Sequence, residues 1–236
     1  MCLNKHSVDA KKTMRLVLII CLLVMSFSVN AQKNKATNNT IGLNVAELPS
    51  LTIDLNYSYA IKPYFDLVGS IGYSFNHTYA ADLNFILVPH IKCGNCGIVM
   101  KNQTGGFVKT MLKLNVRKSY ETRNYFFIGI SIINSVVYEK ADFSDYYSDY
   151  EMQGPPNTVI IDNPIREQTK YIFGIGTRLG YSLKMGEKLQ GDLGLQIAFP
   201  NNRYKSLFGY QNYIPGMGCK DSYSYWFPRL FFYIKY

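Results

Sequence analysis

The feature that most constrains the fold is a period-two alternation of apolar residues with small or polar ones along segments of unusual length. Between Thr169 and Lys184, 16 residues, the odd positions are mostly apolar or aromatic and the even positions are mostly glycine, serine or basic. Because successive side chains of a strand lie on opposite faces, this pattern predicts a strand with two different faces. It recurs at 41–46, 51–61, 64–75, 108–117, 126–136, 188–199 and 225–236, which gives eight candidate strands.

The length of these segments points to a membrane. Strands of soluble domains usually have about 5–6 residues, whereas a tilted strand that crosses a bilayer needs about 9–11. The alternative is a secreted sandwich or a lipocalin-like barrel with its apolar face inward. Glycine and serine on the polar face favour the inside of a narrow closed barrel, because they leave room for charged neighbours. We therefore predict that the apolar face contacts lipid and the polar face lines the lumen.

The connections between the candidate strands give an independent indication. Three are short (61–64, 119–123 and 185–187) and three are long (77–105, 141–167 and 200–222), and the two kinds alternate along the chain. Short turns on one side and long loops on the other are typical of outer-membrane barrels. The first hairpin, at 47–50, is short although it falls on the long-loop side. The predicted fold is all-β: an antiparallel transmembrane β-barrel over 41–236, most simply with eight strands, or with ten if 83–91 and 98–101 also pair.

The N-terminus has the pattern of a cleaved secretory signal peptide over residues 1–31. Basic residues precede an apolar stretch of 12 residues, Leu16 to Phe27, and Val29 to Ala31 forms a cleavage site of the small-x-small type. A retained anchor is the alternative, but 12 residues are too few for a helix to cross the roughly 30 Å of hydrocarbon. Residues 32–40 have no apolar pattern and are expected to form a flexible lead-in.

The chain end carries the most specific signal. Leu230, Phe232, Ile234 and the terminal Tyr236 stand at alternate positions. This arrangement is similar to the C-terminal signature of bacterial outer-membrane barrels. With the signal peptide, the chain resembles the small outer-membrane β-barrel family of Bacteroidetes-type Gram-negative bacteria, whose functions are largely unassigned. The resemblance implies location in the cell outer membrane, contact with outer-membrane lipid and lipopolysaccharide, and recognition of the last strand by the barrel-assembly machinery.

Charged residues occupy the predicted inner face. They are Asp54, Asp66, Lys109, Lys113, Arg117, Glu139, Lys170, Arg178, Asp192 and Arg229. Buried charges are costly unless they are paired and hydrogen-bonded, so we interpret this set as an ion-pair network that fills the lumen. Lys109, Lys113 and Arg117 share one strand face and need acids from other strands, for which Asp54 and Asp66 are candidates. The basic excess leaves a narrow anion-preferring pore as an alternative.

Three cysteines follow the signal peptide: Cys93, Cys96 and Cys219. An exported protein meets oxidising conditions, so a disulfide within this set is favoured over free thiols. A zinc site that combines the three cysteines with His90 is the third alternative, because all four residues fall on the long-loop side. We predict neither a metal site nor a cofactor.

The remaining residues give little indication of catalysis. His77 and His90 are the histidines that follow the signal peptide, and no G-x-S-x-G motif occurs, so we assign no catalytic residue. A lipid A or phospholipid hydrolase that uses His77 is the enzymatic alternative. The acidic, tyrosine-rich stretch 142–151 is expected to form a solvated loop or the contact region for an extracellular ligand. The basic residues form no exposed patch, so no nucleic-acid partner is expected. The predicted role is structural or one of surface interaction.

Overall fold

The computed structural model describes residues 39–77, 82–87, 99–119, 121–122, 124–142, 165–201, 204–207, 212–220 and 225–236. The predicted signal peptide, nearly all of the lead-in, His90, Cys93 and Cys96 lie outside these residues. Within this described part of the chain, no helix is long and apolar enough to cross a membrane.

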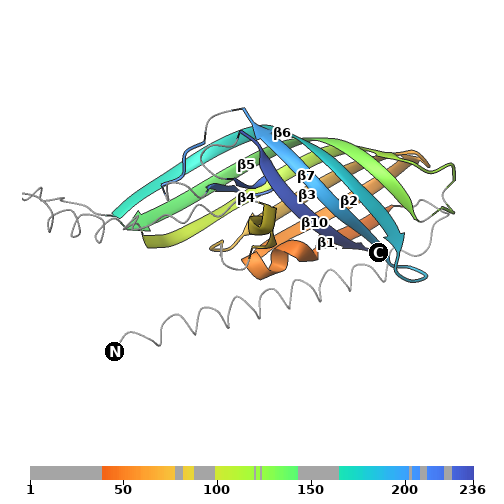
Figure 1. Cartoon of the computed structure of the whole chain (residues 1–236), viewed down its shortest axis with the longest axis horizontal. Helices are drawn as coiled ribbons and strands as arrows, with labels where there is room; N and C mark the ends of the chain where they lie inside the picture. Colours follow the sequence, from red (N-terminus) through yellow and green to blue (C-terminus); the bar gives the residue numbers. More distant parts are fainter. Residues whose placement is uncertain are drawn as a thin grey trace, which may run out of the picture. The chain divides into compact units, whose positions relative to one another are not determined.

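The described chain forms a closed antiparallel barrel of eight strands, in the order β1-β10-β7-β6-β5-β4-β3-β2 (Figure 1). The barrel strands are β1 (Thr40–Asn44), β2 (Thr52–Lys62), β3 (Phe65–Ser74), β4 (Val99–Asn115), β5 (Tyr125–Asp142), β6 (Ile165–Lys184), β7 (Gln190–Pro200) and β10 (Phe227–Lys235). Two 3₁₀ helices, η1 (Val45–Ser50) and η3 (Leu83–Leu87), and a separate hairpin of β8 (Asn212–Ile214) and β9 (Gly218–Lys220) complete the described elements.

The prediction of an eight-stranded barrel is confirmed, and the ten-strand alternative is wrong. The described part of the first extra segment, Leu83–Leu87, forms η3 instead of a strand, and Val99–Lys101 of the second segment is the start of β4.

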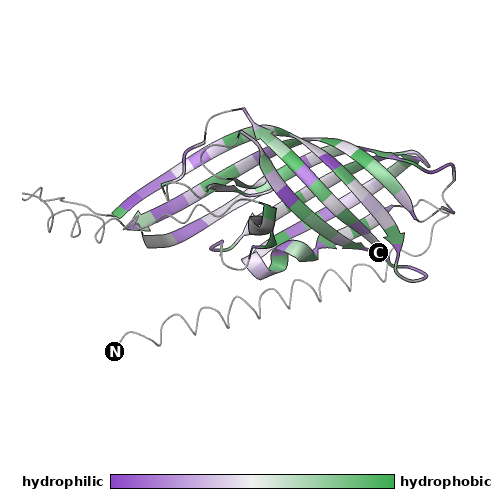
Figure 2. Ribbon diagram, viewed as in Figure 1, coloured by the Kyte–Doolittle hydropathy of each residue, from purple (hydrophilic) through white to green (hydrophobic). Residues whose placement is uncertain are grey.

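The apolar face of the barrel points outward. Along β5, buried and exposed residues alternate without a break from Tyr125 to Val137. The exposed set is large and apolar, and includes Ile71 and Ile130, which are each 61% exposed, and Leu179, which is 64% exposed. Figure 2 shows the same alternation as hydrophobic and hydrophilic bands along the strands. The middle of these outer faces is mostly aliphatic, although Tyr57 and the half-buried Phe232 also lie there. Other aromatic residues lie toward the two ends: Tyr73, Phe173, Phe199 and Trp226 near the long loops, and Tyr64, Phe126 and Tyr236 near the short turns.

Strands β4, β5 and β6 extend beyond the others on the long-loop side (Figure 1). The pairing of β6 with β7 ends at Gly174, whereas its pairing with β5 continues to Ile165, so residues 165–173 project past the end of β7. At about 3.4 Å per residue, these nine residues span about 30 Å. Side chains 165–171 are exposed or half-buried on both faces of β6. The sequence assigned part of this region to loops because alternation stops where both faces of a strand meet water.

The barrel closes at a seam between the first and last strands. The register pairs Gly42–Asn44 of β1 with Tyr233–Lys235 of β10, and two backbone hydrogen bonds between Ile41 and Tyr236 extend the seam by one further pair. Beyond it, β10 lies next to η1 and η3. The backbone N–H of Leu230 donates to Asn84 Oδ1 at 2.6 Å, and that of Phe232 donates to Asn44 Oδ1 at 3.0 Å. Side-chain amides therefore satisfy backbone donors that a longer β1 would otherwise pair.

A charge placed on the outer face tests whether this surface meets lipid. We expect Ile130→Arg, in the middle of the aliphatic band, to lower the free energy of unfolding in vesicles by about 2–4 kcal/mol, because Arg near the bilayer midplane is costly. Val116→Arg, at the short-turn end, is the matched control and is expected to cost about 0–1 kcal/mol. Urea titration followed by the fluorescence of the single tryptophan, Trp226, measures both. Equal effects at the two sites would contradict a lipid-facing band.

Candidate functional site

The described part of the chain buries equal numbers of acidic and basic side chains. The six carboxylates are Glu47, Asp54, Asp66, Asp82, Glu139 and Asp192. The six basic groups are Lys109, Lys113, Arg178, Arg229 and Lys235, together with Arg117, which is half-buried as a residue but whose side chain is 6% exposed. The predicted set had a basic excess because it lacked the acids Glu47 and Asp82. It also lacked Lys235 and included the exposed Lys170, two differences that cancel in the charge balance. Lys235 follows the alternation of the last strand and was detectable from it. Glu47 and Asp82 lie outside the barrel strands, where periodicity gives no signal.

Arg229 on β10 is the centre of the largest charge cluster. Its guanidinium contacts Glu47 through Nε, Asp54 Oδ2 through Nη2 at 2.6 Å, and the Gly216 carbonyl through Nη1 at 3.1 Å. The side chains of Arg229, Asp54 and Glu47 are at most 1% exposed. Arg229 thus joins the barrel wall, the first hairpin and the last long loop, which are far apart in the sequence.

Two further basic groups surround Asp54. Lys109 Nζ lies 3.7 Å from Asp54 Oδ2 and 4.9 Å from the centre of the Phe107 ring, so an ion pair and a cation–π contact both stabilise its charge. Arg178 donates to Gln196 Oε1 at 2.9 Å and to the hydroxyl of Tyr233 at 3.2 Å. Tyr233 in turn donates to Asp54. Asp54 therefore balances charge from several strands at one level of the lumen.

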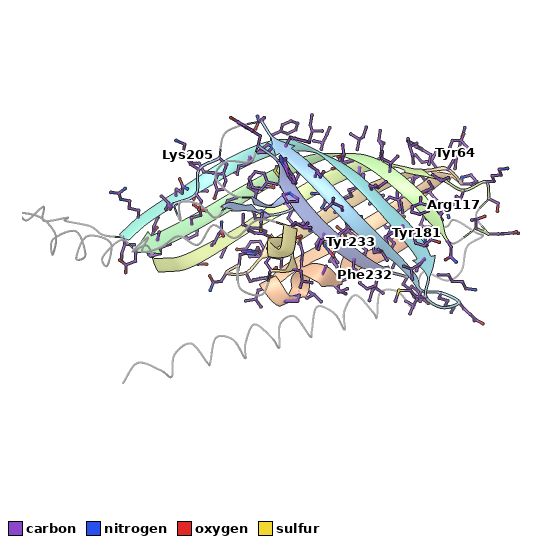
Figure 3. All side chains as sticks on the ribbon, in the orientation of Figure 1. Tyr64, Arg117, Tyr181, Lys205, Phe232 and Tyr233 are labelled. Atoms are coloured by element: carbon purple, nitrogen blue, oxygen red, sulfur yellow. The ribbon has the colours of Figure 1, made fainter. Side chains whose placement is uncertain are left out.

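A second cluster lies nearer the short turns. Asp192 Oδ2 accepts from Lys113 at 2.7 Å and lies 2.6 Å from Lys235 Nζ, while Oδ1 accepts from Ser182 at 2.6 Å. At the rim, Arg117 lies 3.7 Å from Asp66, which also accepts from Asn115 at 2.8 Å. The label of Arg117 in Figure 3 marks this end of the barrel. Lys109, Lys113 and Arg117, which share one strand face, therefore each have a different acidic neighbour. These neighbours are Asp54, Asp192 and Asp66, respectively.

Aromatic rings fill the spaces between the charges. Phe107, Tyr125, Phe127, Phe231 and Tyr233 are all buried. A Cβ on Gly180 would collide with the ring of Phe127, so glycine leaves the space that this ring occupies. The alternation predicted small and charged residues on the inner face and gave no indication of the rings of Phe107, Tyr125, Phe127 and Phe231 there.

The long-loop end of the lumen is filled by the hairpin of β8 and β9, residues 212–220, which we call the plug hairpin. Residues 213–219 are all buried. Its turn accepts hydrogen bonds from three barrel strands: Ser135 Oγ donates to the Pro215 carbonyl at 2.6 Å, Gln196 Nε2 to that of Gly216 at 2.9 Å, and Arg229 also to Gly216. The sequence placed this segment in a surface loop, because short buried hairpins carry no clear periodic signal.

Glycine is required at the tip of the plug hairpin. Gly216 has φ +78°, a conformation that side chains rarely adopt, and a Cβ there would meet the ring of Phe107. The tip therefore packs against the barrel wall at van der Waals distance.

Glu139 binds a second segment of the same long loop, residues 204–207, at the same end of the barrel. Its carboxylate accepts from Gln103 at 2.9 Å, Gln168 at 2.6 Å, Ser206 at 2.7 Å and the backbone N–H of Leu207 at 2.8 Å, and also from the Tyr204 hydroxyl. Multiple neutral donors compensate the burial of this carboxylate.

Lys170 is a correction to the predicted network. Its side chain is exposed, although it shares strand parity with the buried Arg178. Lys170 lies in the part of β6 that projects past β7, where the even face no longer lines a closed lumen.

Cys219 is also placed differently from the predicted disulfide: it is a buried free thiol. It donates to Asp82 Oδ2 at 3.0 Å, and His77 Nε2 lies 3.1 Å from the same oxygen. Burial and the neighbouring charge of Asp82 raise the pKa of the Cys219 thiol well above its ordinary value. Burial raises the pKa of Asp82, but the hydrogen bond and charge of His77 outweigh it, so the net pKa is lowered. A pairing of Cys93 with Cys96 stays a prediction.

The residues of the C-terminal signature share the outer face of β10. Leu230, Phe232 and Ile234 are half-buried, and Tyr236 is 39% exposed. Figure 3 labels Phe232 beside Tyr233, whose side chain is on the opposite, inner face. Neither signature nor network residues form a catalytic arrangement within the described residues.

Neither a protein family nor a curated protein sequence matches this chain. Among solved structures, the chain is similar to Neisserial surface protein A (NspA), with 7% sequence identity and a TM-score of 0.39 over 84% of this chain and 90% of that chain. A likeness of this degree gives no information about activity, so the functional conclusions rest on the geometry of the chain itself.

Removal of Arg229 tests the energetic role of the largest cluster. We expect Arg229→Met to lower the free energy of unfolding by about 3–5 kcal/mol. The buried Glu47 would lose its basic partner, and Asp54 would keep only Lys109 and the Tyr233 hydroxyl of the contacts described above. Adding Glu47→Gln and Asp54→Asn to this variant is expected to restore part of the loss. Lys170→Met, which removes an exposed charge, is the control and should change stability by at most about 0.5 kcal/mol. The same urea titration measures all three, and a small effect of Arg229→Met would contradict the cluster's role.

Proposed function

We propose that this protein is an outer-membrane β-barrel with a closed lumen, and that its role is structural or one of surface interaction. The observation that carries the proposal is the plug hairpin, which is buried in a lumen already occupied by balanced charges and aromatic rings. An eight-stranded barrel is just wide enough for side chains to fill. The outer apolar face with aromatic residues toward both ends supports the membrane location, because bacterial outer-membrane barrels carry such girdles.

The projecting sheet supports a role at the cell surface. Strands β5 and β6 form a ribbon whose described part extends about 30 Å past β7, and the segment 143–164 joins these two strands in the sequence. The segment contains several tyrosine and acidic residues, and tyrosine provides contact area at a low entropic cost. We propose that this segment contacts an extracellular ligand.

The two alternatives from the sequence find less support in the described residues. An anion-preferring pore needs an excess of basic groups along an open path, but the buried charges are balanced at six of each sign. A lipid hydrolase needs a histidine that reaches lipid, but His77 is 1% exposed and stacks on the Tyr213 ring with centroids 3.6 Å apart.

Single-channel recording tests the closed lumen. We expect no conductance steps from the purified protein in planar bilayers, because side chains and the plug hairpin occupy the lumen. A porin added afterwards to the same bilayer checks that insertion is detectable. Steady steps whose ion preference changes in Lys113→Glu would support the pore instead and overturn this part of the proposal.

Replacement of residues 143–164 by a two-residue Asn-Gly turn tests the surface contact. The barrel is expected to fold, because β5 and β6 already pair up to Asp142 and Ile165. Binding of cells that display the protein to arrays of glycans and matrix proteins is expected to be lost. A variant with an altered turn at 185–187, on the opposite side of the barrel, is the control and should keep any binding. Unchanged binding after the replacement would exclude this segment as the contact region.

A further inference from the structure

Three side chains with metal-binding atoms converge at the plug hairpin. His77 follows β3, Asp82 precedes η3, and Cys219 lies on β9. One ligand atom from each lies within 4.8 Å of the other two. The three side chains are at most 5% exposed. The group thus brings together two segments of the long-loop side that are 137 residues apart between Asp82 and Cys219.

The spacing between the Asp82 ligand atom and the other two ligand atoms is close to that of a tetrahedral metal site. Zinc bonds of about 2.0–2.3 Å to nitrogen, oxygen and sulfur require ligand atoms about 3.3–3.8 Å apart. Asp82 Oδ2 lies 3.1 Å from His77 Nε2 and 3.0 Å from Cys219 Sγ. The ligands therefore need to separate by only a few tenths of an ångström from Asp82 to admit an ion.

The surrounding residues hold the ligands in orientation. The backbone N–H and the Nδ2 of Asn84 donate to Asp82 Oδ1 at 2.8 and 2.7 Å, which leaves Oδ2 directed to His77 and Cys219. The ring of Tyr213 stacks on that of His77 with 7° between their planes. Partners that orient ligands in this way are typical of metal sites in proteins.

The donor set selects the kind of ion. A thiolate, an imidazole and a carboxylate together suit zinc better than calcium or magnesium, which prefer oxygen ligands. A divalent cation with one thiolate, one carboxylate and a neutral imidazole has a net charge of zero, which a buried site favours. We propose that His77, Asp82 and Cys219 bind a zinc ion that fastens the plug hairpin to the loop after β3.

This site differs from the zinc alternative considered from the sequence, which combined Cys219 with His90, Cys93 and Cys96. The ligands from the first long loop are instead His77 and Asp82. Three protein ligands leave a fourth position for a small ligand such as water.

Cobalt substitution in a single-thiol variant tests the proposal. Cys2, Cys21, Cys93 and Cys96 are changed to serine in the full chain, so Cys219 is the remaining thiol. The protein is refolded from urea in detergent with Co²⁺. We expect one bound ion per chain, a thiolate-to-cobalt charge-transfer band in the near ultraviolet and the visible bands of a tetrahedral site. Zn²⁺ is expected to displace the cobalt and to slow hydrogen exchange of residues 213–219.

The ligand variants distinguish this site from adventitious binding. Cys219→Ser in the same background is expected to abolish the charge-transfer band. His77→Ala and Asp82→Asn are expected to weaken zinc binding at least about tenfold. Substitution of residues that merely orient metal ligands already lowers metal affinity by about this factor. Heat-dependent migration in gels confirms that each variant is folded. If the single-thiol protein folds and binds no stoichiometric metal, or if binding survives His77→Ala and Asp82→Asn unchanged, the proposal is overturned and the three groups form only a hydrogen-bonded cluster.

Discussion

The structure depends on how the narrow barrel compensates the charges that it encloses. A carboxylate or ammonium group inside a wall with an apolar outer face has no bulk water to stabilise it, so each needs an opposite charge or several hydrogen-bond donors. Arg229 shows the consequence for folding. Because its guanidinium contacts Asp54 on β2, Glu47 on η1 and the Gly216 carbonyl of the plug hairpin, one side chain positions three parts of the chain at once.

The same requirement explains why the plug hairpin lies in the lumen. The side chains of Ser135, Gln196 and Arg229 point inward and donate to carbonyl groups of the hairpin turn. Without the hairpin, these groups would need water or another partner. The hairpin also brings Cys219 to His77 and Asp82, so the filling of the barrel and the proposed zinc site depend on the same segment. A closed lumen in turn leaves the projecting strands β4 to β6 as the part of the described chain that is best placed for external contacts.

The barrel strands could be predicted in detail because the apolar outer face requires apolar side chains at alternate positions of each strand. Segments such as Thr169 to Lys184 place an apolar side chain outward at each second position, and this rule gave the strand number and the face of Asp54, Lys113 and Asp192. It did not give the full length of β4, β5 and β6, since apolar and polar residues no longer alternate regularly where these strands project past β3 and β7. It also placed Lys170 in the lumen, although that residue lies beyond the closed part of the barrel.

The sequence by itself determined the class of fold, the strand count and which face is apolar, because alternation is a local property that each strand expresses independently. Tertiary structure alone decided which charges meet. The partners of Lys113 and Arg229 depend on the order and register of strands from both ends of the chain. The positions of Glu47, of the plug hairpin and of the His77, Asp82 and Cys219 group were decided in the same way. These segments have no periodicity of their own, and their place is set by the space and the unsatisfied polar groups that the closed barrel presents to them.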